Sequence, residues 1–375
     1  MLERIRSFLL SGGGWPYLLT PFILVAIALD VIHAPDTAIF ATSALGVVPT
    51  AALMGRATEE LAERSGPGIG GLLNVTFGNA PELIIALLAL NAGLYEVVKA
   101  SLIGSILGNI LLVLGAAMAA GGAGRRVQRF NRTAASSQSS MLLVAAMAFT
   151  LPAIYVLVKG GSLPAPGAEA VRFGAKVEQL SFALAIVLGL TYVAGLVFSL
   201  KTHRDLFNPP ENEDAQETDG PEPWSVRRAV LLLALAGIAV AGMSEILVHS
   251  ISGAAHSAGL TEFFIGAIVV AVVGNAAEHW VAVLVARKDK MDLAVGIAIG
   301  SSAQIALFVV PVLVLASFVI GPRPMPLVLN GFELGALLLA VLIANGVTSE
   351  GESTWFEGVL LLATYGVLAL AFAFA

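Results

Sequence analysis

Long apolar runs alternate with short polar segments along the chain, a pattern typical of a protein that crosses a membrane many times. A helix that spans a bilayer needs about 20 mostly apolar residues. Eleven runs meet this requirement: 16–34, 37–55, 69–92, 96–120, 139–159, 177–200, 226–250, 263–286, 292–320, 326–345 and 355–374. We therefore predict an all-α polytopic membrane protein with eleven transmembrane helices in a lipid bilayer, and we interpret the first run as a retained helix instead of a signal peptide.

The composition supports this fold class and excludes several functions. Of the 375 residues, 57% are hydrophobic and 12% are charged, whereas a soluble domain has about 25% charged residues. The chain has no cysteine, which excludes disulfides, zinc–thiolate sites and thiol catalysis. A net charge of −6 without a basic stripe argues against a nucleic-acid partner. Oligomeric state is left open.

The distribution of lysine and arginine predicts the orientation. Positive side chains gather in cytoplasmic loops. With eleven spans, fifteen lysine and arginine residues fall on the side of the amino terminus and five on the other side. We expect a cytoplasmic amino terminus and an external carboxyl terminus.

Two polar motifs interrupt the apolar runs, and they repeat. Gly-Asn-Ala-Pro-Glu at 78–82 matches Gly-Asn-Ala-Ala-Glu at 274–278, at an offset of 196 residues. A Gly-Ser pair follows each motif at the same distance, at 104–105 and 300–301. Two motifs with equally spaced second matches indicate an internal duplication.

The duplication predicts the domain organisation. The motifs lie in the third and eighth runs, and an odd number of spans per unit inverts the second copy, as in many secondary transporters. We expect an additional N-terminal helix (1–35), a first five-helix repeat (36–200), an acidic cytoplasmic linker (201–225) and a second, inverted five-helix repeat (226–375). The acidic stretch 211–222 is either a solvated disordered loop or a cation-attracting regulatory segment.

At these motifs the sequence resembles the calcium/cation–proton exchanger family, within the cation/calcium exchanger superfamily. The resemblance rests on "GNAPELI" with "GSILGNILLVLG", on "GNAAEHWVAV" with "GSSAQIALFV", and on "ATEELAERSG" at 57–66. It implies antiport of Ca²⁺ for H⁺ by alternating access, without a cofactor, in a prokaryotic plasma membrane or alternatively a vacuolar membrane. The two copies differ at one position of the motif, where the first has Pro81 and the second has Ala277, so the two half-sites are not expected to be fully equivalent.

The motif residues favour a hard, oxygen-rich cation site. Each motif places an asparagine three residues before a glutamate, on one face of a helix. Pro81 cannot donate a hydrogen bond to the carbonyl oxygen of Phe77, which is expected to be left free. Calcium takes six to eight oxygens in flexible geometry. The expected cation ligands are Glu82, Glu278, Asn79, Asn275 and Phe77.

Charge explains how protons could be coupled to the cation. Two ionised glutamates are costly in a low dielectric, and either one calcium ion or two protons would neutralise them. His279, next to Glu278, could line the same cavity, relay a proton or ligate a transition metal. The alternatives are a structural glutamate pair, a histidine bonded to a neighbouring helix, and asparagines that link helices.

A further set of residues could form the pathway or support the site. Glycine allows close backbone approach, small polar residues occur where helices pack, and acids near a helix end are commonly solvated. These residues are Gly78, Gly274, Ser105, Ser301, Gln304, Glu245, Glu59 and Glu60. We place the Glu59–Glu60 pair at the cytoplasmic mouth, and Glu245 either on the cation path or towards water.

Two other functions compete with a calcium–proton exchanger. Paired acids can form the filter of a cation-selective channel, and a neutral His279 would also suit Mn²⁺ or Zn²⁺ in a transition-metal proton exchanger. Because Glu278-His279 lacks the spacing of a zinc-protease helix, we expect no enzyme.

Overall fold

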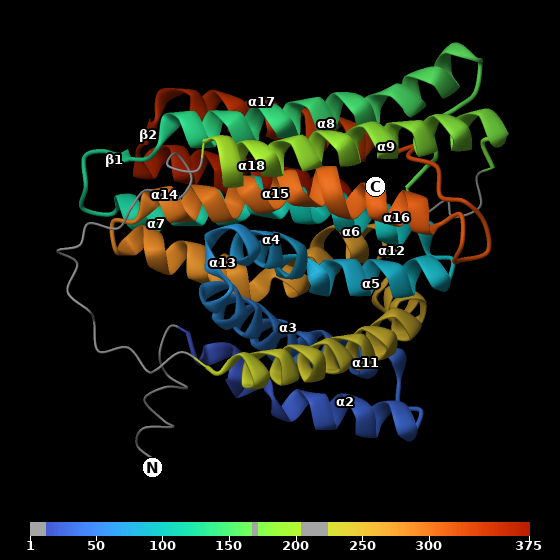
Figure 1. Cartoon of the computed structure of the whole chain (residues 1–375). Helices are drawn as coiled ribbons and strands as arrows, with labels where there is room; N and C mark the ends of the chain where they lie inside the picture. Colours follow the sequence, from blue (N-terminus) through green and yellow to red (C-terminus); the bar gives the residue numbers. More distant parts are fainter. Residues whose placement is uncertain (1–12, 167–171, 204–223) are drawn as a thin grey trace.

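The computed structural model describes residues 13–166, 172–203 and 224–375, and most of them are helical (Figure 1). The amino-terminal basic residues and the acidic stretch 211–222, both used in the sequence predictions, lie outside the described residues. The helices lie side by side and run roughly parallel or antiparallel to one another (Figure 1).

The first half of the chain forms the following elements, in chain order. They are η1 (Trp15–Leu19), α2 (Pro21–Val31), α3 (Asp36–Arg64), α4 (Gly66–Gly78), α5 (Ala80–Asn91), α6 (Tyr95–Leu107), η2 (Gly108–Val113), α7 (Leu114–Gly122), β1 (Gln128–Arg129), α8 (Arg132–Val158), α9 (Ala175–Val197) and η3 (Phe198–Thr202). The segment η1 is a 3₁₀ turn, whereas η2 and η3 are π-helical.

The second half forms a similar series. It comprises α11 (Val226–Ala258), α12 (Glu262–Phe264), η4 (Ile265–Val270), α13 (Ala271–Arg287), α14 (Met291–Val295), η5 (Gly296–Gly300), α15 (Ser301–Gln304), η6 (Ile305–Val309), α16 (Val310–Ala316), α17 (Gly331–Glu350), β2 (Glu352–Ser353) and α18 (Trp355–Ala373). The segments η4, η5 and η6 are π-helical turns within longer helices.

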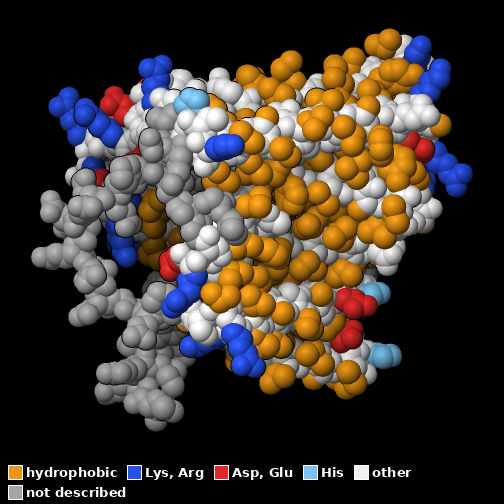
Figure 2. Space-filling model, in the orientation of Figure 1, with side chains coloured by type: hydrophobic (Ala, Val, Ile, Leu, Met, Phe, Trp, Pro, Cys, Tyr) orange, Lys and Arg blue, Asp and Glu red, His pale blue; other side chains and the backbone are white. Residues whose placement is uncertain are grey.

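The surface carries the apolar band expected of a membrane protein. Among the described residues, nine helices are long and apolar enough to cross a membrane, and the bent pair α4–α5 would make a tenth. The segment Trp15–Val31 is apolar but shorter. Figure 2 shows apolar side chains over the middle of the molecule, with charged side chains gathered towards its two ends.

Several helix ends differ from the predicted ones, and at two of the helix starts a capping residue sets the end. The helix expected at 139–159 begins at Arg132, where the side chain of Asn131 accepts a hydrogen bond from the backbone of Ala134. The helix expected at 326–345 begins at Gly331, after a capping box formed by Asn330 and Glu333. The helix predicted to end at residue 55 continues to Arg64.

A short two-stranded sheet marks one end of the molecule, which we call the strand end. Antiparallel β1 and β2 pair Gln128 with Ser353 and Arg129 with Glu352. Because β1 follows α7 and β2 follows α17, the helices α6–η2–α7 and α17 both start at the opposite end and finish here.

Close packing between helices of the two halves depends on small residues. The helices α3 and α11 pack along one another, as do α8 and α17, and α6 packs against η4. At the last contact the Cα of Gly104 lies so near the backbone of Ala267 that there is no space for a Cβ atom. The halves therefore interdigitate through backbone contact at this position.

This contact yields a prediction for stability. Gly104→Ala should lower the free energy of unfolding by about 1–3 kcal/mol, because the added methyl group forces α6 and η4 apart. The matched control is Gly237→Ala in α11, where a Cβ meets nothing within 4 Å. Thermal unfolding in detergent measures both. Equal melting temperatures for the two variants would contradict the packing argument.

Candidate functional site

The first polar motif breaks its helix. Asn79 separates α4 from α5, with φ −97° and ψ 16°, and the two helices meet at a bend of 40°. Pro81, in the first turn of α5, has no N–H to continue the hydrogen-bond ladder of α4. Asn79 therefore sits at a junction between half-helices, instead of sharing one helix face with Glu82 as predicted.

The second motif lies in a continuous helix. Asn275 and Glu278 are both within α13, where Ala277 replaces the proline of the first copy. The two copies thus differ in backbone geometry at the position where their sequences differ.

The two motifs face one cavity of about 940 Å³. Its mouth lies at the strand end, where exposed Asn131, Asp289 and Asp292 line it. The lining residues of α5 and α13 farthest from that end are Glu82 and Gly274. The cavity is therefore a blind pocket with both motif glutamates at or near its base.

Glu82 is the most confined acid of this pocket. Its side chain is 9% exposed, and its Oε2 atom has no hydrogen-bond partner among the described residues. A methyl group at Gly274 would lie 3.5 Å from Glu82 Oε1, so the carboxylate faces bare backbone of the opposite repeat motif. Glu82 also lies in the first turn of α5, where the helix dipole favours a negative charge.

Glu278 faces the same cavity and is held differently. Ser301, on α15, donates a hydrogen bond from Oγ to Glu278 Oε2 at 3.3 Å. Both residues line the cavity. The second glutamate is thus positioned by a hydroxyl donor, in a helix that has no free end at that point.

The motif asparagines cross-link the two halves of the chain. Asn79 Nδ2 donates to Gln304 Oε1 at 2.5 Å. Asn275 Nδ2 donates to Ser105 Oγ at 3.1 Å and to the carbonyl of Ala271 at 3.0 Å. Each asparagine donates an Nδ2 hydrogen bond to a side chain of the other half of the chain, and neither of these bonds uses its Oδ1.

The amide oxygens differ in where they lie. Asn275 is buried, and its Oδ1 has no partner among the described residues. Asn79 and Gln304 both line the cavity, whereas Asn275 does not. The cavity base therefore offers side-chain oxygens from Glu82, Glu278, Asn79, Gln304 and Ser301.

His279 does not line this cavity, and its predicted placement there was wrong. Its Nε2 lies 3.1 Å from Oδ1 of Asn109, a buried residue of η2. The Nδ2 of Asn109 has no partner among the described residues. His279 is instead bonded to a neighbouring helix, which was the alternative reading of its sequence.

Two neighbouring acids lie towards the mouth of the cavity. Glu59 and Glu60 of α3 both line it. Glu60 accepts the backbone N–H of Trp224 at 2.7 Å, and the Trp224 ring lies between the guanidinium groups of Arg56 and Arg228, at 4.9 and 4.8 Å. Glu60 is therefore fixed to the start of α11, whereas Glu59 is exposed.

Two further residues differ from expectation. The carbonyl oxygen of Phe77 was expected to be free, but it accepts the N–H of Asn79. A carbonyl oxygen has two lone pairs, so one acceptor position is unused by this bond. Glu245 is exposed on α11 and does not line the cavity, so the structure does not place it on the predicted cation path.

The sequence reasoning missed Asn109 and Gln138. Gln138 of α8 lines the cavity next to Gly300, and both residues look like ordinary interhelical polar residues in the sequence. At the 196-residue offset, Asn109 corresponds to Ile305 and Gln138 to Leu334, so the repeat gives no signal for either residue.

The base of the cavity combines two carboxylates with neutral oxygen donors. In the part of the chain that the structure describes, no group of three or more histidine, aspartate or glutamate side chains could hold a metal ion. Two carboxylates with amide and hydroxyl oxygens form a hard but weakly charged set. Such a set fits a cation that must also be released.

Comparison with known proteins identifies the family. The model of the sodium/calcium exchanger protein family matches residues 36–201 and 228–374, which contain both polar motifs. The chain belongs to this family. The two matched stretches lie on either side of the acidic stretch.

Individual relatives are similar over nearly the whole chain. The Ca²⁺/H⁺ antiporter of Synechocystis sp. is 46% identical over 356 residues, 90% of this chain and 91% of the relative. The Ca²⁺/H⁺ antiporter ChaA of Bacillus subtilis is 45% identical, covering 94% of this chain and 98% of the relative. The solved structure of native YfkE superposes with a TM-score of 0.79 at 39% identity, covering 96% of this chain and all of that one.

The His279–Asn109 contact yields a prediction. Their positions in the other repeat are Leu83 and Ile305. His279→Leu or Asn109→Ile alone should cost about 1–3 kcal/mol of stability, because the first leaves buried Asn109 without its partner and the second leaves partly buried His279 without its partner. The double variant should cost less than the sum of the two. Melting temperatures of all four proteins give the coupling; strict additivity would show that the pair makes no stabilising bond.

Proposed function

We propose that this protein is a secondary active antiporter that exchanges Ca²⁺ for H⁺ across a membrane by alternating access. The observation that carries the proposal is that Glu82 and Glu278, from the two copies of one motif, line the same blind cavity. The names of the relatives from Synechocystis and Bacillus subtilis agree with it.

The chemistry of the pocket base favours this exchange. Two carboxylates without a paired cation are costly in a site of low dielectric, and one calcium ion or two protons restores neutrality. Asn79, Gln304 and Ser301 supply further oxygens, and the carbonyl end of α4 lies at the same break. The loaded forms can change conformation, whereas the empty ionised form resists it, and this obliges calcium and protons to exchange.

The cavity is open in one direction, as alternating access requires of each state. We assign its mouth, at the strand end, to the cytoplasmic side, with the carboxyl terminus outside. The lysine and arginine distribution supports this orientation. The bacterial relatives support a prokaryotic plasma membrane as the location.

The internal duplication supports an inverted-repeat layout of eleven helices, one of them additional. The helices α3 and α11, and likewise α8 and α17, occupy equivalent places in the 196-residue offset and pack against each other. The π-helical segments η2 and η6 are also equivalent in this offset. We infer that Trp15–Val31 and the bent pair α4–α5 complete the eleven.

The proposed ligands also indicate the cation. Oxygen donors favour calcium, and His279, the only nitrogen ligand predicted for a transition metal, bonds Asn109 outside the cavity.

Uptake into proteoliposomes under an imposed pH gradient, with calcium, manganese, sodium and magnesium compared, tests which ion is carried and whether protons are coupled to it. Ohmic current without proton coupling would instead indicate a channel.

Neutralising either motif glutamate should disable exchange. Glu82→Gln and Glu278→Gln should each lower apparent calcium affinity at least about tenfold, because the number of charged ligands sets calcium affinity. Glu245→Gln, on the exposed face of α11, is the matched control and should exchange like the wild type. Calcium-driven proton flux in proteoliposomes measures all three. A Glu82→Gln protein that exchanges calcium for protons at a near wild-type rate would contradict the proposal.

Protons and calcium should compete for the pocket. As pH falls on the side that the cavity faces, the carboxylates take up protons and apparent calcium affinity should decrease. Two protons should bind as a coupled pair, so the decrease should be steeper than for one group. Calcium binding against pH, in wild type and in both glutamine variants, measures this. Wild-type affinity that stays level from mildly acidic to alkaline pH would refute competition.

A further inference from the structure

A second group of charged residues lies buried at the end of the molecule opposite the strand end. Glu96 and Lys99 belong to the first turns of α6, and Glu333 to the first turn of α17. Their exposed fractions are 2%, 5% and 0%. The group therefore joins the two halves of the chain in an environment shielded from water.

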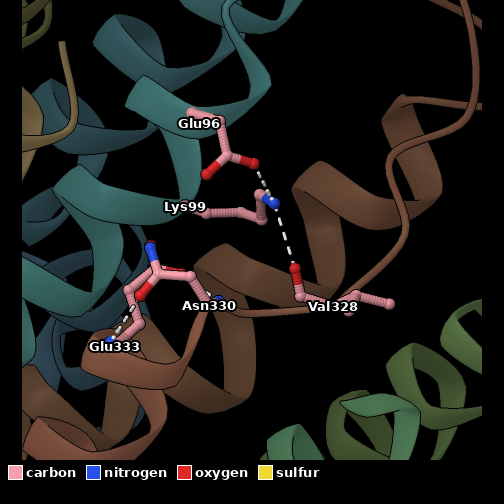
Figure 3. Close-up of polar contacts among 5 residues, drawn as sticks. All are labelled: Glu96, Lys99, Val328, Asn330 and Glu333. Atoms are coloured by element: carbon pink, nitrogen blue, oxygen red, sulfur yellow. Dashed lines mark hydrogen bonds and ion pairs between the residues drawn. The ribbon is translucent and has the colours of Figure 1, made fainter. Parts of the chain in front are cut away.

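Its contacts leave part of the group unsatisfied. Lys99 Nζ forms an ion pair with Glu96 Oε1 and donates to the carbonyl of Val328 at 3.0 Å (Figure 3). Glu333 Oε2 accepts the N–H of Asn330 at 2.8 Å, as part of the capping box. Among the described residues, Glu96 Oε2, Glu333 Oε1 and Asn330 Nδ2 have no partner.

The charges of this group do not balance. Lys99 and Glu96 are the charged groups that act electrostatically on Glu333. Two carboxylates and one ammonium leave one excess negative charge, which is costly in a dry site. Tyr95 and Arg323 lie nearby but are engaged with each other: the Tyr95 hydroxyl donates to the Arg323 carbonyl at 2.8 Å, and the guanidinium lies 5.2 Å from the Tyr95 ring.

A proton fits this excess charge better than a metal ion does. The ammonium of Lys99 already occupies the position beside Glu96 where a cation would bind (Figure 3). With the ammonium in place, the two carboxylates keep a single excess negative charge, which one proton cancels and a divalent cation would overcompensate. A carboxylic acid, in contrast, is neutral and supplies a donor.

We propose that Glu96, Lys99 and Glu333 form a proton-binding site, separate from the cation pocket, that holds one proton on its two carboxyl groups while this end is closed. The proton converts one carboxylate to a carboxylic acid and leaves a neutral Lys99–carboxylate pair beside it. Because the site bridges α6 and α17, its proton allows these helix ends to pack without water. The proposal goes beyond calcium–proton exchange and does not depend on it.

Infrared spectroscopy of the full chain in lipid nanodiscs tests the site, because a carboxylic acid has a carbonyl band that a carboxylate lacks. At neutral pH, Glu96→Gln and Glu333→Gln should each remove one acid equivalent, since either variant balances the charge. Glu333→Gln can keep the capping box, because an amide oxygen can accept the Asn330 N–H. Lys99→Met should add one acid equivalent.

The matched control is Glu357→Gln, which alters the equivalent capping box of α18, with Thr354. It should leave the acid band unchanged. Undiminished bands in both Glu96→Gln and Glu333→Gln would overturn the proposal.

The wild type provides a second measurement in case the variants fail to fold. Saturating calcium should remove the carboxylic-acid bands of Glu82 and Glu278 and leave one acid equivalent, that of the Glu96–Glu333 group. Loss of every acid band would overturn the proposal. If calcium changes no band while the variants remove theirs, the cation-pocket mechanism fails and this site stands.

Discussion

The cost of placing a carboxylate inside an apolar helix bundle is the constraint on which the rest of this structure depends. Such a charge must be neutralised, hydrated or bonded. Glu82 satisfies it by facing a water-accessible pocket, at a helix break that provides a positive helix end. Glu278 satisfies it with a serine hydroxyl in the same pocket. The cavity, the break at Asn79 and the glycine opposite Glu82 all lie where this requirement is met.

The two halves meet the same requirement by different means, so the pocket is not symmetric. Pro81 breaks the first helix, and Ala277 leaves the second continuous. At the offset of 196 residues, Gln304 corresponds to Gly108. The side chain of Gln304 accepts a hydrogen bond from Asn79, whereas a glycine has no side chain that could bond the asparagine of the other motif. A site that releases its ion to opposite sides does not need identical halves. It needs two carboxylates that both halves bring to one place.

The sequence was sufficient for what depends on hydropathy and repetition, and insufficient for what depends on local hydrogen bonds. Apolar runs located the helices, and the duplicated motif indicated that Glu82 and Glu278 would meet. Helix ends at Arg132 and Gly331 depend on caps, which hydropathy does not report. The partner of His279 could not be predicted either, because it lies 170 residues away in the sequence. Orientation of Glu245 depends on which face of α11 meets α3.

Acids lie inside the bundle at both of its ends, and at both their negative charge must be neutralised. The two places differ in their access to solution, because one is an open pocket and the other is closed. In the pocket, Glu82 and Glu278 face a cavity with an exposed mouth, so an ion from solution can neutralise them. At the opposite end, Glu96 pairs with Lys99, and Glu333 is buried near them where α6 and α17 pack (Figure 3). Because the ammonium of Lys99 already pairs with Glu96, one excess negative charge remains at this end, and one proton neutralises it. When a transporter opens its two ends alternately, water reaches the acids at one end while the acids at the other end are enclosed. The excess charge of the pocket and that of the Glu96–Glu333 group therefore both act on the equilibrium between the two open states.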